Sequence, residues 1–430
     1  MSKAISTILG GAILLTSVAS AAQAGGLERG GYNYDLLFSE ERVTGEAGVI
    51  YVMPDRRIKN AQDTLARDGM GADGRGGGKT SVDETENYTI PRVGIKVGIT
   101  QDFDCLAQYS QPWGVHTKPG DDWVGANENI ETKIESHDYG MTCSYKFDVG
   151  KGSLRAIGGV SYQEVEGFKE RLVVGQVLAS PFAAAGFDGT GVLDLKGDGV
   201  GWRIGAAYEI PEIALRASLI YNAEVDLGQV NGTIDVTEVP TFFANPALPF
   251  AGRVIDVYGT ATMPQSLEFK LQSGIAPGWL AYGSVKWVDW SVLDVVAFCP
   301  TATKGQVACG PSSPARATSL DLMFQDGWTV TAGIGHKFNE QWSGQVQVSW
   351  DRGTSTGLTT QTDTWLLSSG VAWSPNKNVE LRVGGAVGML SSGSFGPTEC
   401  VGNQPCGDKV KYDFGDDFVS ALSVSGKIKF

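Results

Sequence analysis

The sequence has little histidine, and what it has is not arranged for catalysis. Three histidines occur in 430 residues, His116, His137 and His336. None stands in a recognisable serine–histidine–acid or metal-binding arrangement. The six cysteines form no Cys-x-x-Cys motif and have no histidine beside them, which disfavours a metal site, the competing interpretation of the cysteines. The sequence therefore predicts no enzyme, no metal and no cofactor.

Long apolar runs are absent after the first residues. No later segment approaches the ~18 uninterrupted apolar residues of a membrane helix. Residues 1–24 combine Lys3, an apolar run and the small-residue site Ala22-Gln23-Ala24, which is typical of a secretory signal peptide. The mature chain is expected to begin near Gly25. An exported chain without membrane helices is either soluble or a β-barrel.

Basic residues are also scarce. Lys and Arg number 34 against 48 Asp and Glu, giving a net charge of −14. This balance argues against nucleic acid as a partner. No linker divides the chain, although a soluble chain of this length would normally split into domains.

Alternating segments recur through the chain. The last, residues 418–430, places Phe418, Leu422, Val424, Ile428 and Phe430 on one face and mostly polar residues on the other. A terminal aromatic residue on such a strand is typical of outer-membrane barrels. Strands are expected at 45–54, 89–99, 104–115, 131–147, 152–166, 199–210, 212–230, 263–274, 279–293, 327–338, 342–352, 363–374, 379–391 and 418–430. Their even number suits a single-chain barrel.

The connections decide between a soluble sandwich and a barrel. Links after even-numbered segments are tiny, as at 100–103 and 375–378, whereas those after odd-numbered segments are long, as at 167–198 and 231–262. This asymmetry is typical of outer-membrane barrels. We therefore predict an all-β protein of the bacterial outer membrane, with residues 45–430 forming a 14-stranded antiparallel transmembrane barrel. Tryptophans near strand ends would form interfacial girdles: Trp202, Trp279, Trp287, Trp290, Trp328, Trp342, Trp350 and Trp373.

Residues 25–44 precede the first strand and are too apolar to be left in solvent. We expect them to fold into the lumen as a small plug, with these apolar side chains: Leu27, Tyr32, Tyr34, Leu36, Leu37 and Phe38. The oxidising compartment predicts disulfides, pairing Cys105 with Cys143, Cys299 with Cys309, and Cys400 with Cys406.

Three stretches resemble the FadL/TodX type of outer-membrane long-chain fatty acid transporter. Residues 165–181 resemble the family's third extracellular loop, residues 199–221 its sixth and seventh strands, and residues 281–291 its ninth strand. The Asn-Pro-Ala often found in the family's plug is missing before residue 50, so the plug is expected to be shortened. The resemblance implies passive uptake of long-chain fatty acids or other hydrophobic compounds. Ligands would be captured on apolar loops and released sideways at the third strand.

The long loops at 167–198 and 231–262 are unusually apolar, which is typical of a binding surface. An alternative is that they pack together as a lid. The candidate ligand-binding residues are Arg171, Leu172, Val174, Val177, Leu178, Phe182, Phe187, Phe242, Phe243, Leu248 and Phe250. The resemblance implies that Arg171 binds the carboxylate of the ligand, which suits a guanidinium. Alternatively, Arg171 forms an ion pair with Glu166 or Glu170.

Pro112, Trp113 and Gly114 interrupt the third strand, since proline cannot donate to a ladder and glycine leaves a space. They are the candidate lateral gate, unless the strand simply ends there. Charged residues along the inward faces of the strands would form a structural network. We expect a monomer surrounded by outer-membrane lipid. An aqueous general porin and a structural or adhesive barrel are the alternatives, and the ligand's identity stays open.

Overall fold

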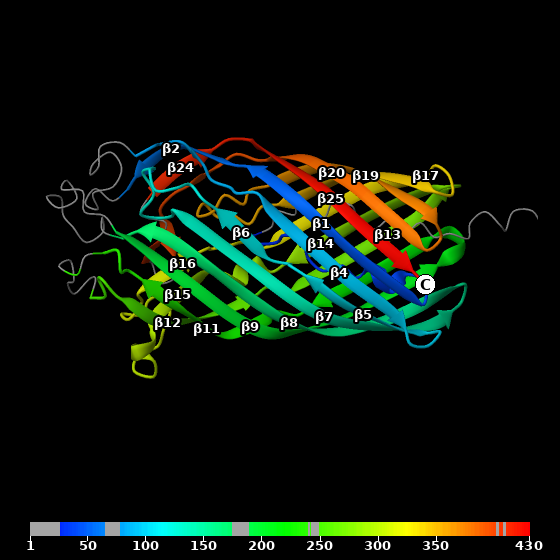
Figure 1. The fold of residues 1–430 in the computed structure, drawn as a ribbon, viewed down its shortest axis with the longest axis horizontal. Helices are drawn as coiled ribbons and strands as arrows, with labels where there is room; N and C mark the ends of the chain where they lie inside the picture. The colour runs from blue at the N-terminus through cyan, green and yellow to red at the C-terminus, as the bar shows by residue number, and fades with distance from the viewer. Residues whose placement is uncertain are drawn as a thin grey trace, which may run out of the picture.

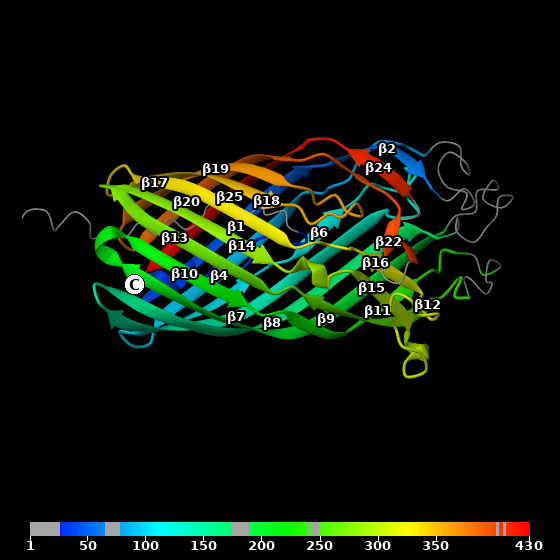
Figure 2. The ribbon, with the colours of Figure 1, turned by 180° about the vertical axis from the view of Figure 1, so that it is seen from behind.

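The computed structural model describes residues 26–64, 78–173, 189–239, 241, 249–400, 404–406 and 410–430, with backbone alone at 399–400 and 404–406. The expected signal peptide lies outside these residues. Within them, no helix is long and apolar enough to cross a membrane. The strands slant around a single closed barrel, seen from two sides in Figures 1 and 2.

Fourteen antiparallel strands form the wall, as the sequence predicted. Nine are continuous: β1 (Val43–Asp55), β4 (Tyr88–Gly98), β7 (Glu131–Val149), β8 (Gly152–Leu172), β9 (Thr190–Ile210), β18 (Trp342–Arg352), β19 (Thr364–Asn376), β20 (Val379–Leu390) and β25 (Asp417–Lys429). Five are interrupted: β5 (Phe103–Ser110) with β6 (Gly114–Thr117), β10 (Leu215–Asn222) with β11 (Val225–Asp235), β12 (Val254–Met263) with β13 (Ser266–Ala276), β14 (Trp279–Val288) with β15 (Val295–Pro300), and β16 (Thr318–Asp321) with β17 (Gly327–Lys337).

The first strand closes the barrel. Strand β1 pairs with β4 on one side and with β25 on the other. The backbone N–H of Phe430 donates to Val43 O at 2.8 Å, and the N–H of Val43 donates to Phe430 O at 3.1 Å. The terminal residue therefore completes the ring.

The two faces of the wall differ as a membrane barrel requires. Along β7, Asp138 and Thr142 are fully buried in the interior, whereas Tyr139 and Met141 are 51% and 54% exposed on the outside. A soluble sandwich would reverse this polarity. The apolar side therefore faces outward and the polar side faces the lumen.

The interrupted strands depart from the predicted continuous ones. The expected strand 212–230 breaks after Asn222, and the break reverses the alternation of faces. Leu219 is 46% exposed outside, whereas Val225 and Leu227 are buried inside. The segments β12, β15 and β16 were not predicted, and β9 begins earlier than expected. Local alternation could not reveal breaks that depend on neighbouring strands.

Trp290 was wrongly assigned to the outer girdle. It lies in the break between β14 and β15, within a short 3₁₀ turn, and is completely buried. Its ring packs edge-on against Trp113, with the ring centroids 5.1 Å apart. The break turns the side chain inward, which sequence periodicity alone could not indicate.

We call the barrel end with the C-terminus and short turns the turn end, and the opposite end the loop end (Figure 1). At the loop end a small sheet joins β2 (Arg57–Asp63), β3 (Val82–Asp83), β21 (Gly393–Phe395) and β24 (Val410–Phe414), and β22 (Thr398–Cys400) pairs with β23 (Gln404–Cys406). Buried aromatic residues hold this sheet to the loop around Trp123. The ring centroids of Phe395 and Tyr412 are 4.7 Å apart, and those of Trp123 and Tyr412 are 5.9 Å apart. We call this assembly the cap.

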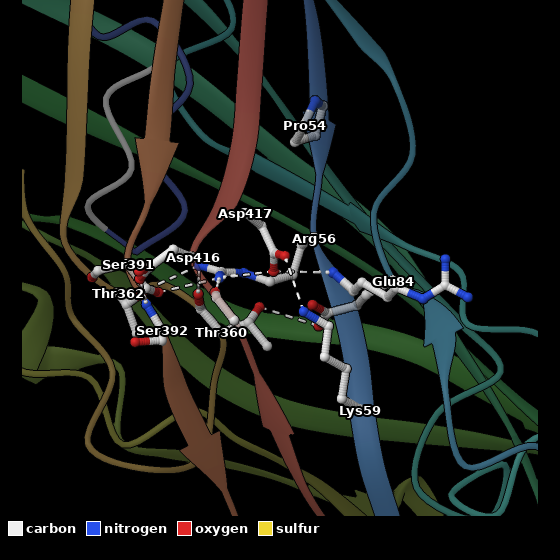
Figure 3. A network of polar contacts seen from close by, with 12 residues as sticks. Pro54, Arg56, Lys59, Glu84, Thr360, Thr362, Ser391, Ser392, Asp416 and Asp417 are labelled. Carbon is white, nitrogen blue, oxygen red and sulfur yellow. Dashed lines mark hydrogen bonds and ion pairs between the residues drawn. The ribbon is translucent and has the colours of Figure 1, made fainter.

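Arg56 ties the cap to the barrel rim (Figure 3). Its guanidinium is 2% exposed and donates to Asp417 Oδ2 at 3.2 Å and Thr362 Oγ1 at 2.9 Å. It also donates to the carbonyl oxygens of Thr360, Ser391 and Gly415. One side chain thus joins the ends of strands that are far apart in the sequence.

Two of the three predicted disulfides are confirmed. Cys105 and Cys143 are directly opposed on β5 and β7 and are bonded, as are Cys299 and Cys309. The side chains of the third pair, Cys400 and Cys406, lie outside the described part of the chain.

Candidate functional site

Residues 26–42, the N-terminal segment, run through the lumen before β1 begins. A short 3₁₀ turn, η1 (Asp35–Phe38), is entirely buried. Asp35 forms ion pairs with Arg216 at 3.3 Å and Lys270 at 3.8 Å, and the Tyr34 hydroxyl donates to Asn222 at 2.5 Å. These contacts fasten the segment to the wall.

The apolar residues expected in the plug lie in two apolar clusters, Leu27 in one and the others in the second. Leu27, Tyr34, Leu36, Leu37 and Phe38 are all buried, and Tyr32 is half-buried. β1 begins at Val43, slightly before the predicted plug ends. Leu36 and Leu37 pack with Leu106 of β5 and Ile157 of β8.

Charged side chains fill the lumen toward the turn end. Asp104 pairs with Lys96 at 2.8 Å and with Arg155 at 2.7 Å, and Arg155 pairs with Glu209 at 2.7 Å. A second group joins Glu46, Arg382, Glu380, Lys427 and Lys429. A cavity of about 620 Å³ opens beside the first group. This half of the lumen is therefore polar and charged.

The lumen toward the loop end is apolar instead. A cavity of about 70 Å³, the apolar cavity, lies between the N-terminal segment and the interrupted strands. Its apolar lining comes from Leu27, Ile134, Val165, Phe168, Leu195, Leu227, Val230, Ala261, Met263, Leu293, Val296, Phe298, Leu320 and Leu322. The strand breaks turn several of these side chains inward. Sequence alternation missed this site because a continuous strand over 212–230 would place Leu227 on the same outer face as Leu219.

A second cavity of about 130 Å³, the cap cavity, lies next to the apolar one. The two share Leu27, Ile134 and Leu322 among their lining residues. The cap supplies Trp123 and Tyr412 to the second cavity. A ligand in the apolar cavity could therefore extend toward the cap.

An outer pocket of about 330 Å³ contains two of the predicted binding residues, Arg171 and Phe250. Lys169 and Arg316 also line it, which makes one side cationic. The Arg171 guanidinium donates to the Asn127 carbonyl at 3.4 Å.

The other predicted binding residues do not line these cavities in the described structure. Leu172 is buried with the apolar core of the cap, so it is not an exposed docking residue. The remaining candidates lie outside the described residues: Val174, Val177, Leu178, Phe182, Phe187, Phe242, Phe243 and Leu248.

The third strand is interrupted at residues 111–113. Strand β5 pairs with β4 as far as Ser110, opposite Arg92. Strand β6 pairs with β7, and no pairing of β6 with β4 is present within the described strands. The next bridge beyond the break joins Thr85 to Thr117. The wall ladder is thus discontinuous between the second and third strands.

The predicted gate residues are held by the N-terminal segment. The Arg29 N–H donates to Pro112 O at 2.9 Å, and the Gly114 N–H donates to Leu27 O at 2.7 Å. The Trp113 N–H donates to Ser136 Oγ at 2.8 Å, and its indole N–H donates to Gln163 Oε1 at 3.2 Å. The segment therefore pairs with the break as a short extra strand.

Arg29 occupies the space beside this break. Its side chain is 2% exposed, and its guanidinium lies 4.2 Å from the centre of the Tyr88 ring on β4. A Cβ at Gly114 would lie 2.6 Å from Arg29 Nε and 2.7 Å from Ile134 O, so glycine is required for this close approach. Sequence reasoning missed Arg29. The only signal was its charge within an apolar stretch.

A closed barrel with an apolar outer face, a charged lumen and an internal apolar cavity defines a bacterial outer-membrane transport protein rather than an enzyme. Residues 22–409 match the family described as outer membrane protein transport protein (OMPP1/FadL/TodX), and the chain belongs to that family.

Curated relatives and solved structures agree with this assignment. The long-chain fatty acid transport protein of Escherichia coli K12 is 23% identical over 401 residues, covering 85% of this chain and 82% of the relative. A Pseudomonas aeruginosa FadL homologue shares the fold with a TM-score of 0.73 at 15% identity, over 92% of each chain. The P. putida toluene transporter TodX gives 0.59 at 16% identity, also over 92% of each.

Proposed function

We propose that this protein carries long-chain fatty acids or other hydrophobic compounds passively across the outer membrane and releases them sideways into it. The apolar cavity carries the proposal because it adjoins the N-terminal segment, which itself pairs with the break in the third strand. Leu27 lines the cavity, and its carbonyl accepts from the Gly114 N–H, so a ligand leaving past Leu27 would meet the discontinuous wall between β4 and β6. The protein would act as a monomer in outer-membrane lipid.

The charged half of the lumen supports sideways release. Straight passage to the turn end would bring an apolar body against buried ion pairs such as Arg155–Asp104. Disturbing such pairs is costly because each charge loses its partner. Transfer into lipid instead gains roughly 0.8 kcal/mol per methylene relative to water. This gain can drive uptake without an energy-coupling step.

Capture would begin at the loop end. The outer pocket places the cationic groups Lys169, Arg171 and Arg316 near Phe250, so it suits an amphiphile with an anionic head. The predicted apolar loops would add area for the tail. Most of the affinity is expected from the tail, because a charged contact near solvent adds little.

Uptake by cells that lack their own transporter of this type tests the proposal. Val230→Asn places an amide in the apolar cavity and should lower the initial rate of radiolabelled oleate uptake about tenfold or more, since a buried unpaired amide costs ~1–3 kcal/mol. Val254→Asn is the matched control, because Val254 is 53% exposed on the next strand. Equal rates for both variants at equal surface expression would refute capture in this cavity.

A further inference from the structure

The cap cavity contains several hydrogen-bond acceptors that lack donors. Four buried oxygen atoms in its lining have no hydrogen-bond partner within the described structure: Glu84 Oε2, Asp321 Oδ1, Thr359 Oγ1 and Gln361 Oε1. Glu84 as a residue is only 7% exposed, and its other oxygen accepts from Thr360 Oγ1 at 3.2 Å. Unpaired buried acceptors are unfavourable and rare in folded proteins. Their gathering in one cavity points to a donor that arrives with the ligand.

The neighbouring apolar cavity suits the rest of such a ligand. The two cavities adjoin, because they share Leu27, Ile134 and Leu322 among their lining residues. We propose that the joined cavities bind an uncharged hydrophobic alcohol or phenol, with its hydroxyl among the cap acceptors and its apolar body in the apolar cavity. This inference rests on the proposed function and names the class of compound that the inner site prefers.

The surrounding charges favour a neutral donor. Glu84, Asp321 and Glu128 line the cap cavity and would repel a carboxylate. Lys169 lines both cavities, and its charge is paired with Glu128 at 3.2 Å. An ammonium group would be attracted by the carboxylates, but it would lose its hydration in a small and largely apolar space, which is costly for a charge. A hydroxyl avoids both the repulsion and this cost, and it can still donate a hydrogen bond.

Glu84 is held in place by the Arg56 network. Figure 3 shows Glu84 beside Arg56 and Thr360, at the point where the cap meets the rim. The guanidinium hydrogen bonds of Arg56 go to Asp417, Thr362 and backbone carbonyls rather than to Glu84 Oε2. The free oxygen of Glu84 is therefore positioned but not occupied by this neighbour.

Binding of matched ten-carbon probes tests the inference. The full barrel in lipid nanodiscs is titrated calorimetrically at pH 8, with empty nanodiscs as the blank. Decan-1-ol and methyl nonyl ether have the same number of heavy atoms, but the ether cannot donate. We expect the alcohol to bind about tenfold more tightly, as one hydrogen bond to a charged acceptor implies. Decanoate and decylammonium should bind more weakly than the alcohol.

Two variants separate the acceptor groups from the apolar contacts. Glu84→Gln keeps the shape but offers an amide that can donate, so the alcohol-to-ether affinity ratio should fall toward one. Thr359→Val removes a hydroxyl of the same size and should lower the ratio in part. Thr356→Val is the control, because Thr356 is exposed in the same loop and does not line the cavity.

The outcomes are distinct. Equal binding of alcohol and ether by the unmodified protein would overturn the inference while leaving hydrophobic capture intact. Tightest binding of decanoate would overturn it too, in favour of the cationic outer pocket. If neither the ether nor the alcohol binds above the blank, the proposed function itself fails. A selective loss of alcohol affinity in Glu84→Gln supports the assigned site.

Discussion

At the scale of single residues, the structure buries some charged groups, although burial removes their hydration and costs free energy. Glu84 is one such group. Burial raises the pKa of its carboxyl to about 7, and the Thr360 hydrogen bond and the Arg56 charge oppose that shift only in part. Strongly shifted buried carboxyls are more often found at functional sites than on ordinary surfaces. This fits its position in the lining of the cap cavity.

The Glu84 carboxyl should make the cap less stable as pH rises. Its folded pKa lies above the unfolded one, so the folded state binds the proton more tightly. The destabilisation is absent below about pH 4.5, grows up to about pH 7 and is then complete, on the order of 3 kcal/mol. Hydrogen exchange of β24, corrected for intrinsic rates, should show protection falling over this window.

Substitution identifies the titrating group. Glu84→Gln should flatten the profile, because the amide does not ionise. Asp83→Asn, at an exposed position next to it, should leave the profile unchanged. A pH-dependent protection that persists in Glu84→Gln would assign the effect to another group.

Arg29 is expected to restrain release at the wall. It lies between Tyr88 of β4 and Gly114 of β6, and its Nε has no hydrogen-bond partner within the described structure. Arg29→Ala should therefore raise the initial rate of hydrophobic uptake severalfold, while the backbone pairing with Pro112 and Gly114 is retained. Arg42→Ala, at the turn end, is the control. Unchanged or slower uptake in Arg29→Ala would count against release through this break.

At the scale of secondary-structure elements, the third strand is unusual because it is short on both sides of its break. β5 is held to β4 and β7, and the Cys105–Cys143 bond joins it to β7 on the turn side of the break. The ladder already fixes the register. The disulfide should therefore contribute to stability rather than to transport.

Removing each disulfide gives a graded prediction. The double variant Cys105→Ser/Cys143→Ser removes a bond between residues 38 apart in the sequence. The double variant Cys299→Ser/Cys309→Ser removes one between residues 10 apart. Chain entropy then predicts losses of about 4 and about 3 kcal/mol as upper values. Urea unfolding midpoints should fall in that order, with oleate uptake retained. Loss of uptake by a folded Cys105/Cys143 double variant would show that the bond also shapes the proposed lateral gate.

At the scale of the whole molecule, polarity divides the lumen in two. Ion pairs occupy the turn half, and the interrupted strands form an apolar cavity in the loop half. The N-terminal segment joins the halves, with Asp35 in the first and Leu27 lining the second. An aqueous porin would not need this division.

Conductance in planar bilayers tests this arrangement. The intact barrel should conduct small ions poorly, because the N-terminal segment is anchored across the lumen by contacts such as Asp35–Arg216. Deleting residues 26–42 should raise the conductance clearly. Asp35→Asn, which removes one anchor but keeps the segment, should raise it less. High conductance in the intact barrel would favour the porin alternative.

Much of this organisation follows from the sequence alone. Period-two alternation and the asymmetry of the connections determine the fourteen strands, because a membrane barrel must present apolar residues to lipid on every strand. The apolar residues of the N-terminal segment predict burial. Opposed positions on neighbouring strands predict the Cys105–Cys143 bond. These features depend on local pattern and spacing.

The apolar cavity depended on tertiary structure. Whether Val225 and Leu227 face lipid or lumen is decided by the break after Asn222, which arises from pairing with β9, β12 and β13. Arg29 and Glu84 gain their surroundings from strands far away in the chain. Alternation assigns a residue to one of two faces, but only the closed barrel decides which face surrounds a cavity, because that depends on how distant strands bend together.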